Sequence, residues 1–248
     1  LVFIISEGMK KAEKLRKELG ISNIEAVNIF DILKFKENIS IIKMNFSKHL
    51  SGMIVTKGSE KAILINSTMS LGRQVFTAAH EYDHLKFDND LNEHKECKEN
   101  EANEFASYFL MPETALLSVI TERGINKFSI NDIIYLEHYF KLSHKALLRR
   151  LIKGKYISQK EYDNYSSLDI IETAFKLGYE IDLYIPTNEE RTVTSTYAEV
   201  AEKALNKNKI SNSKYENYLI EGGYEEIVFG SPIDGYKEEL DNEFEDCF

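Results

Sequence analysis

Two histidines and a glutamate in residues 80–84 have the types and spacing of a hydrolytic metal site. His80 and His84 lie four residues apart, and Glu81 directly follows the first. On a helix, residues four apart project from one face, so both imidazoles can bind one metal ion. Glu81 would then be able to accept a proton from the water that the metal holds. The pattern indicates a zinc hydrolase.

A third ligand must lie elsewhere in the chain, because hydrolytic zinc usually has three protein ligands and keeps a fourth position for water. Glu99 and Glu101 are the downstream candidates. At 3.6 residues per turn, Glu99 shares a stripe with Asn103 and two apolar residues, whereas Glu101 projects nearly opposite. An ionised carboxylate on an apolar stripe is costly unless a cation compensates it. We therefore expect Glu99 to be the third ligand and Asn103 to hydrogen-bond a ligand.

A different zinc site is also compatible with the sequence. His94 and Cys97 have suitable donor atoms and, with His80 or His84, would make a closed structural site. Their segment is rich in Lys and Glu and contains no second cysteine, which argues against that arrangement.

The helix that carries the motif should run from an N-cap at Ser70 to about Phe87. Its apolar residues fall on the side opposite the two histidines, so the helix is expected inside a domain. Gly20 marks the end of an earlier helix, and Lys57-Gly58-Ser59-Glu60 predicts a hairpin turn. The strands expected around that turn, in a small and mainly antiparallel sheet, are 39–44, 52–56 and 61–65. The other expected helices are 9–19, 23–35, 99–110, 112–123, 129–141, 143–153, 168–177, 196–205 and 213–220, with a further strand at 180–185.

Composition bounds the class of protein. The 248 residues, 43% hydrophobic and 29% charged, are ordinary for a globular chain that can bury a sizeable core. Leu1 to Ile5 is too short an apolar run for a membrane span or a signal peptide, and we expect no membrane association. Two distant cysteines, Cys97 and Cys247, favour a cytoplasmic location. Because the chain begins with Leu, a segment can precede it.

The segment from Ser129 to Lys153 consists of two capped helices joined by a short turn, as in a helix-turn-helix. Its second helix and the residues after it carry five basic side chains and no acidic one, namely Lys145, Arg149, Arg150, Lys153 and Lys155. DNA binding is therefore possible, but the net charge of −10 does not favour it. The same helix can instead recognise a protein.

These residues together resemble a known family. The runs Arg73–His84, Glu99–Ala106 and Leu110-Met111-Pro112 resemble the ImmA/IrrE family of zinc metallopeptidases, and the similarity extends over about residues 40–150. The resemblance implies a zincin-like (minimal gluzincin) α+β domain with His80, His84 and Glu99 as zinc ligands and Glu81 as the catalytic base. It also implies a helix-turn-helix repressor as the substrate, whose cleavage would switch on mobile-element or stress-response genes.

Asp83 departs from the family pattern, which often has a small residue there. On a helical wheel it lies about 60° from His80. It can pair with Lys86, bind a ligand histidine, or weaken the active site.

The sequence thus predicts three parts: a metallopeptidase domain at 1–125, a helix-turn-helix-like segment at 126–160, and a mixed domain with an acidic tail at 161–248. The predicted function is zinc-dependent cleavage of a repressor. The alternative is a zinc-binding regulator that binds DNA or a repressor and does not cut. No side chain that would stabilise an oxyanion can be assigned from the 14 tyrosines.

Overall fold

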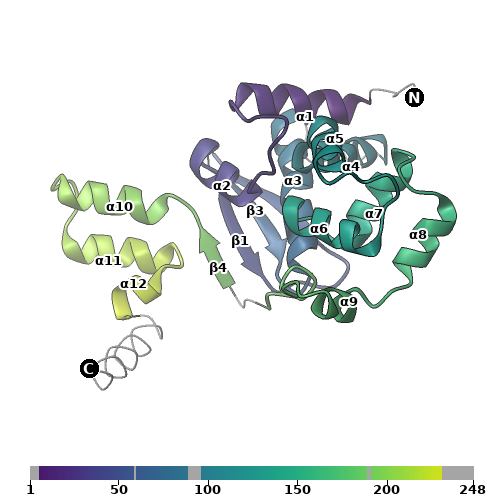
Figure 1. Ribbon diagram of the computed structural model, residues 1–248. Coiled ribbons are helices and arrows are strands. Elements are labelled where there is room, and N and C mark those ends of the chain that lie inside the picture. The colour runs from purple at the N-terminus through teal and green to yellow at the C-terminus, as the bar shows by residue number, and fades with distance from the viewer. Residues whose placement is uncertain (1–5, 59, 89–95, 189–190, 231–248) are drawn as a thin grey trace, which may run out of the picture. The chain divides into compact units, whose positions relative to one another are not determined.

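The computed structural model describes residues 6–58, 60–88, 96–188 and 191–230. The chain is a mixed α+β protein that divides into two compact units, Leu1–Arg191 and Thr192–Phe248 (Figure 1). The acidic tail expected from residue 234 and most of the polar loop expected at 88–98 lie outside the described residues. The three-part division at residues 125 and 160 stays a prediction.

A small sheet has the strand order β2-β3-β1-β4. Its strands are β1 (Ser40–Met44), β2 (Gly52–Lys57), β3 (Glu60–Asn66) and β4 (Arg191–Thr194). The hairpin between β2 and β3 is confirmed: Lys57 pairs with Glu60, and Gly58 adopts a φ of 62° that favours glycine. The expectation of a mainly antiparallel sheet is wrong at β1, which pairs in parallel with β3, Ser40 opposite Ala62. The hairpin fixes only the direction of β2 relative to β3. β1 pairs with the other side of β3, where no short turn forces the two strands to be antiparallel, and β2 is left as an edge strand.

Most helices of the first unit follow the apolar spacing of the sequence, but the helix expected at 23–35 begins only at Ile29, after a turn, and continues as a π-helical turn. The helices of this unit are α1 (Glu7–Glu18), α2 (Ile29–Asp31), a π-helical turn (Ile32–Lys36), α3 (Leu71–Phe87), α4 (Glu96–Leu110), α5 (Glu113–Glu122), α6 (Ile130–Phe140), α7 (His144–Lys153), α8 (Gln159–Ser166) and α9 (Ile170–Lys176). The helix α3 packs against β2 and β3 on one side and against α4 on another (Figure 1). Its predicted apolar face, including Val75, Ala78, Tyr82 and Leu85, is buried as expected.

The helix α1 is fixed to α4 by close backbone contact and by a buried arginine. A Cβ atom at Gly8 would lie 2.5 Å from the carbonyl oxygen of Glu101, so only glycine permits this approach. Arg16, fully buried, donates to the carbonyl oxygen of Phe109 at 2.7 Å and to carbonyls of the loop after α1. These bonds satisfy carbonyl groups that would otherwise lack partners in the interior.

The helices α6 and α7 belong to the same core as the sheet and α3, since Leu136, Phe140, Leu147 and Leu151 are buried in one continuous cluster with them. The expected caps are present: Ser129 forms a capping box with Asp132, and the Ser143 side chain accepts from the amide of Ala146.

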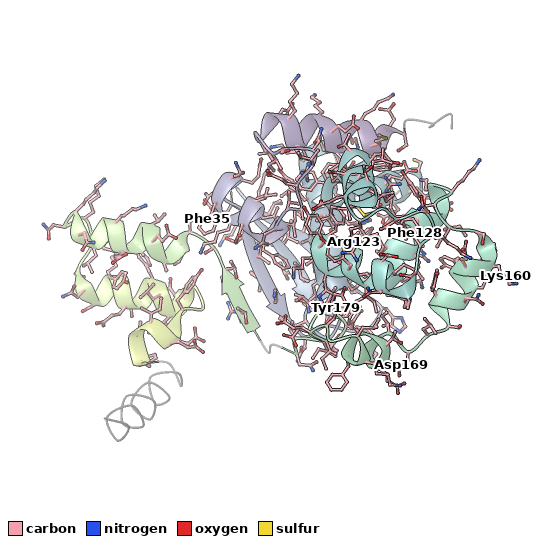
Figure 2. The ribbon with its side chains drawn as sticks, viewed as in Figure 1. Phe35, Arg123, Phe128, Lys160, Asp169 and Tyr179 are labelled. Carbon is pink, nitrogen blue, oxygen red and sulfur yellow. The ribbon has the colours of Figure 1, made fainter. Side chains whose placement is uncertain are left out.

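Two local expectations after α7 were wrong or incomplete. Residues 180–185 form turns, and the only pairing described nearby is an isolated bridge between Ser70 and Pro186. The helix α8 was missed because none of its residues is fully buried, and the side that packs on the core is made by only two tyrosines, Tyr162 and Tyr165. Figure 2 shows Lys160 on the outer side of α8 and Asp169, the N-cap of α9, at the start of the next helix.

The second unit is a small helical group with α10 (Tyr197–Asn206), α11 (Asn212–Glu221) and α12 (Glu225–Phe229). Ala201 and Leu219 are buried within it, and the ring of Tyr197 stacks on that of Tyr224. The helix α11 begins one residue before the expected start at 213, and its cap is Ser211, whose side chain accepts from the amide of Lys214. Among the described residues, no helix has both the length and the apolar character that a membrane span requires.

Candidate metal centre

The N-terminus of α3 is held by distant backbone and not by the predicted cap. Ser70 occupies the N-cap position, but its hydroxyl makes no capping hydrogen bond. The amides of Leu71 and Gly72 donate instead to the carbonyl oxygens of Ile185 and Leu183, at 3.1 and 2.9 Å. The first-turn amides are therefore satisfied by the segment after α9, which sequence spacing cannot reveal.

The edge strand β2 lies unusually close to the face of α3 that carries the motif. A Cβ atom at Gly52 would lie 2.5 Å from Cγ2 of Thr77 and 3.4 Å from Cγ of Glu81. Glycine at this position thus allows the strand to border the site directly. The strand is held in place by buried Asn66, whose side chain donates to the carbonyl oxygens of Ser47 and Leu50.

The structure brings the three predicted ligands together. Donor atoms of His80, His84 and Glu99 all lie within 4.8 Å of one another. The two histidine Nε2 atoms are 3.2 Å apart, Nε2 of His80 is 3.2 Å from Oε2 of Glu99, and Nε2 of His84 is 3.4 Å from Oε1. Glu99 is the most exposed of the three, with 42% of its side-chain surface accessible. This is more than its place on an apolar stripe led us to expect.

The geometry fits a metal ion. Zinc bonds of about 2.0 Å in a tetrahedral site place the ligand atoms about 3.3 Å apart, close to the spacings found here. Burial, followed by the nearby His84, lowers the pKa of His80. A neutral imidazole is the form that binds metals, so the environment favours the binding state. Among the described residues, this is the only group of such side chains with the spacing of a metal site.

Two further residues orient the histidines. The Asn103 side chain hydrogen-bonds His80. Asp88, which sequence reasoning missed, places Oδ2 2.7 Å from Nδ1 of His84, and its side chain is only 10% exposed. A carboxylate on the second nitrogen of a metal-binding histidine fixes the ring and strengthens it as a ligand. The signal was available, because Asp88 stands one helical turn after His84.

Asp83 does not face the candidate metal centre. It is buried, and its Oδ1 lies 3.6 Å from Nζ of Lys11 on α1, which also pairs with Glu101 at 2.8 Å. Burial raises the pKa of Asp83 to about 6. The suggested pairing with Lys86 is wrong, since Lys86 binds Glu37.

The alternative structural site finds no support in the described part of the chain. Cys97 is exposed and free, and it is not part of the cluster. His94 lies outside the described residues.

Glu81 shares a cavity with two of the candidate ligands, His80 and Glu99. The cavity has a volume of about 260 Å³ and is lined by Gly52, Thr77, His80, Glu81, Glu99 and Asn103, together with Ser51, Arg73 and Phe76. A carboxylate that is not part of the ligand cluster thus borders the same space as these two ligands. This arrangement can place a base beside a metal-held reactant.

A helix presenting His-Glu-x-x-His to a carboxylate of the following helix defines a metallopeptidase-like domain. Residues 36–152 match the sequence model of the Peptidase_M78 family, described as the IrrE N-terminal-like domain. This domain of the chain therefore belongs to the ImmA/IrrE family.

Solved structures and curated proteins add little to this assignment. The chain is similar to a Mycobacterium tuberculosis transcriptional regulator, with 16% identity and a TM-score of 0.43, over 58% of this chain and 46% of that one. It therefore spans less than half of the regulator's length, and a similarity of this degree does not extend to function. No curated protein sequence matches the chain.

Proposed function

We propose that this protein is a zinc-dependent endopeptidase that cleaves a helix-turn-helix transcriptional repressor in the cytoplasm. The observation that carries the proposal is the convergence of donor atoms of His80, His84 and Glu99 within 4.8 Å, with Glu81 lining the cavity that His80 and Glu99 also line. Membership of the domain in a peptidase family supports it. The zincin-like fold, the choice of zinc and the repressor substrate are parts of the proposal.

In this mechanism His80, His84 and Glu99 hold the metal, and Asp88 and Asn103 keep the two imidazoles in orientation. When bound, zinc supplies Lewis acidity, which polarises the scissile carbonyl and acidifies the attacking water. Glu81 accepts the proton of that water and passes it to the leaving amine. The cavity positions the carboxylate of Glu81 beside the reacting atoms.

The edge strand β2 offers a place for an extended substrate. The neighbouring strand β3 is interior, with β2 on one side and β1 on the other, so it has no open edge for a peptide. β2 has a free edge within the described sheet, and its first residue, Gly52, lines the metal cavity. Strand addition at β2 would lead the peptide backbone past Glu81.

The test is co-expression with a helix-turn-helix repressor encoded beside the gene for this protein. The wild type should produce discrete repressor fragments and relieve repression of a reporter. Glu81→Gln should leave the repressor intact while the purified variant still binds zinc. Equal fragmentation by both proteins would refute the assignment.

The second candidate, a regulator that binds zinc and a partner without cutting, is favoured by the basic residues of α7. Of the five in and after this helix, Arg150 pairs with Glu113 and Lys153 with Glu104, which leaves fewer for a DNA surface. Salt-dependent retention on duplex DNA, with no cleavage of any repressor, would support this function.

A further inference from the structure

A second cavity adjoins the candidate metal centre. It has a volume of about 510 Å³, and its walls come from α3, α4 and α7. Arg73, Phe76 and Asn103 line both this cavity and the smaller one around His80 and Glu81. A peptide held at the metal centre can therefore extend directly into the second cavity.

The second cavity is rich in positive charge. Five of its lining residues are basic, namely Arg73, Lys145, Arg149, Arg150 and Lys153, and one is acidic, Glu104. A protein with a net charge of −10 thus concentrates cations beside its candidate active site. Such a cleft attracts anions even when the molecule as a whole repels them.

Two of these cations are neutralised by the fold. Arg150 is buried, pairs with Glu113 and stacks over the ring of Tyr108 at 3.9 Å. Lys153 pairs with Glu104 on α4. These contacts fix α7 to α4 and α5, so they serve packing.

The other three cations have no carboxylate partner among the residues that the structure describes. Arg73 donates to the hydroxyl of Ser51 at 3.1 Å, which leaves its charge uncompensated. Arg149 and Lys145 are exposed into the cavity and make no ion pair with any described residue. Partial burial and the charge of Arg149 lower the pKa of Arg73, as expected for neighbouring guanidinium groups. An anion between them would relieve this repulsion.

The approach of the two arginines is built into the backbone. A Cβ atom at Gly72 would lie 2.7 Å from the amide nitrogen of Ser143, so glycine allows the start of α7 to pack directly on α3. Arg73 follows this glycine, and Arg149 lies on α7. Main-chain packing thus brings together the two helices that carry these cations.

We propose that Arg73 and Arg149, with Lys145, bind an Asp or Glu side chain of the peptide substrate, close to the bond that is cleaved. A guanidinium fork matches a carboxylate in shape as well as charge. The inference rests on the proposed peptidase function and specifies its substrate class. A peptide is favoured over DNA because the cations line a hollow that opens into the cavity of Glu81.

Binding can be measured without cleavage. Full-length Glu81→Gln protein, immobilised with zinc present, is incubated with a degenerate ten-residue peptide library, and the retained peptides are sequenced by mass spectrometry. Peptides with Asp or Glu should be enriched about fivefold over the matched Asn and Gln peptides, the upper end of what exposed ion pairs contribute. Adding Arg149→Met should remove the enrichment. Adding Lys160→Met, which removes an exposed charge on α8 remote from both sets of cavity residues, should not.

Absence of enrichment, or enrichment that survives Arg149→Met in a normally folded variant, would overturn the inference. Retention of duplex DNA through Arg149 in place of acidic peptides would also overturn it. The peptidase is judged separately, from cleavage by the protein with Glu81 intact. Binding of acidic peptides through Arg149 without any cleavage would defeat the proposed function and leave this inference standing.

Discussion

Replacing Asp88 tests whether the residues around the candidate ligands support a metal. Asp88 Oδ2 lies 2.7 Å from Nδ1 of His84, and both side chains are about nine-tenths buried. Asp88→Asn keeps a neutral acceptor in this place but removes the charge, so zinc affinity should fall about tenfold, or about 1.4 kcal/mol. Asp88→Ala removes the acceptor as well, and the loss should approach a hundredfold, the upper end measured for such partners.

The assay is a competition titration at pH 7.5 in which the protein takes zinc from a chromophoric chelator of known affinity. Asp83→Asn is the matched control, because it makes the same change one residue before His84 but on the side that faces Lys11. Its zinc affinity should stay within about twofold of the wild type, as its carboxylate orients no predicted ligand. An unchanged affinity in Asp88→Ala, or an equal loss in Asp83→Asn, would refute the reasoning.

Three further predictions concern the packing around the site. Gly52→Ala should lower peptidase activity at least about tenfold with zinc binding retained, because the new methyl group would clash with Cγ2 of Thr77. Adding Thr77→Ser, which removes that Cγ2 methyl, should restore part of the rate in a peptide-cleavage assay. Arg16→Met should lower the free energy of unfolding in urea by about 3 kcal/mol or more, because several buried carbonyl groups lose their donor; a loss under about 1 kcal/mol would contradict this. Burial raises the pKa of Asp83 from 3.8 to about 6, so the folded protein binds a proton at Asp83 more tightly than the unfolded chain does. The folded state therefore loses stability as the pH rises from about 3.8 to about 6. Asp83→Asn should therefore be more stable than the wild type by up to about 3 kcal/mol in urea at pH 7.5 and equal near pH 4, and a pH-independent difference would exclude the explanation.

The candidate site could be predicted from the sequence to the extent that helical periodicity controls it. Two pairs of site residues are each spaced by one helical turn, His80 with His84 on α3 and Glu99 with Asn103 on α4. The apolar residues behind each pair bring the two helices into contact. Sequence periodicity did not place Asp83 correctly. Its neighbour Lys11 comes from α1, and only tertiary packing brings that helix against α3.

The parts that could not be predicted depend on contacts between distant segments. The first backbone amides of α3 donate to the carbonyl groups of Leu183 and Ile185, so the Ser70 hydroxyl has no capping role. The parallel pairing of β1 with β3 likewise depends on how the chain connects distant strands. The adjacent hairpin could be predicted because Gly58 marks its turn in the sequence. The cation pair of Arg73 and Arg149 joins two helices whose separation along the chain hides their proximity.

The most direct test of the central claim is a titration of zinc into metal-free protein while peptide hydrolysis is recorded. Hydrolysis by the wild type should rise with added zinc and stop rising at one equivalent per chain. Glu81→Gln should bind the same one equivalent and remain inactive at every point. Hydrolysis that persists without metal, or in Glu81→Gln, would contradict a site in which His80, His84 and Glu99 hold the metal and Glu81 transfers the proton.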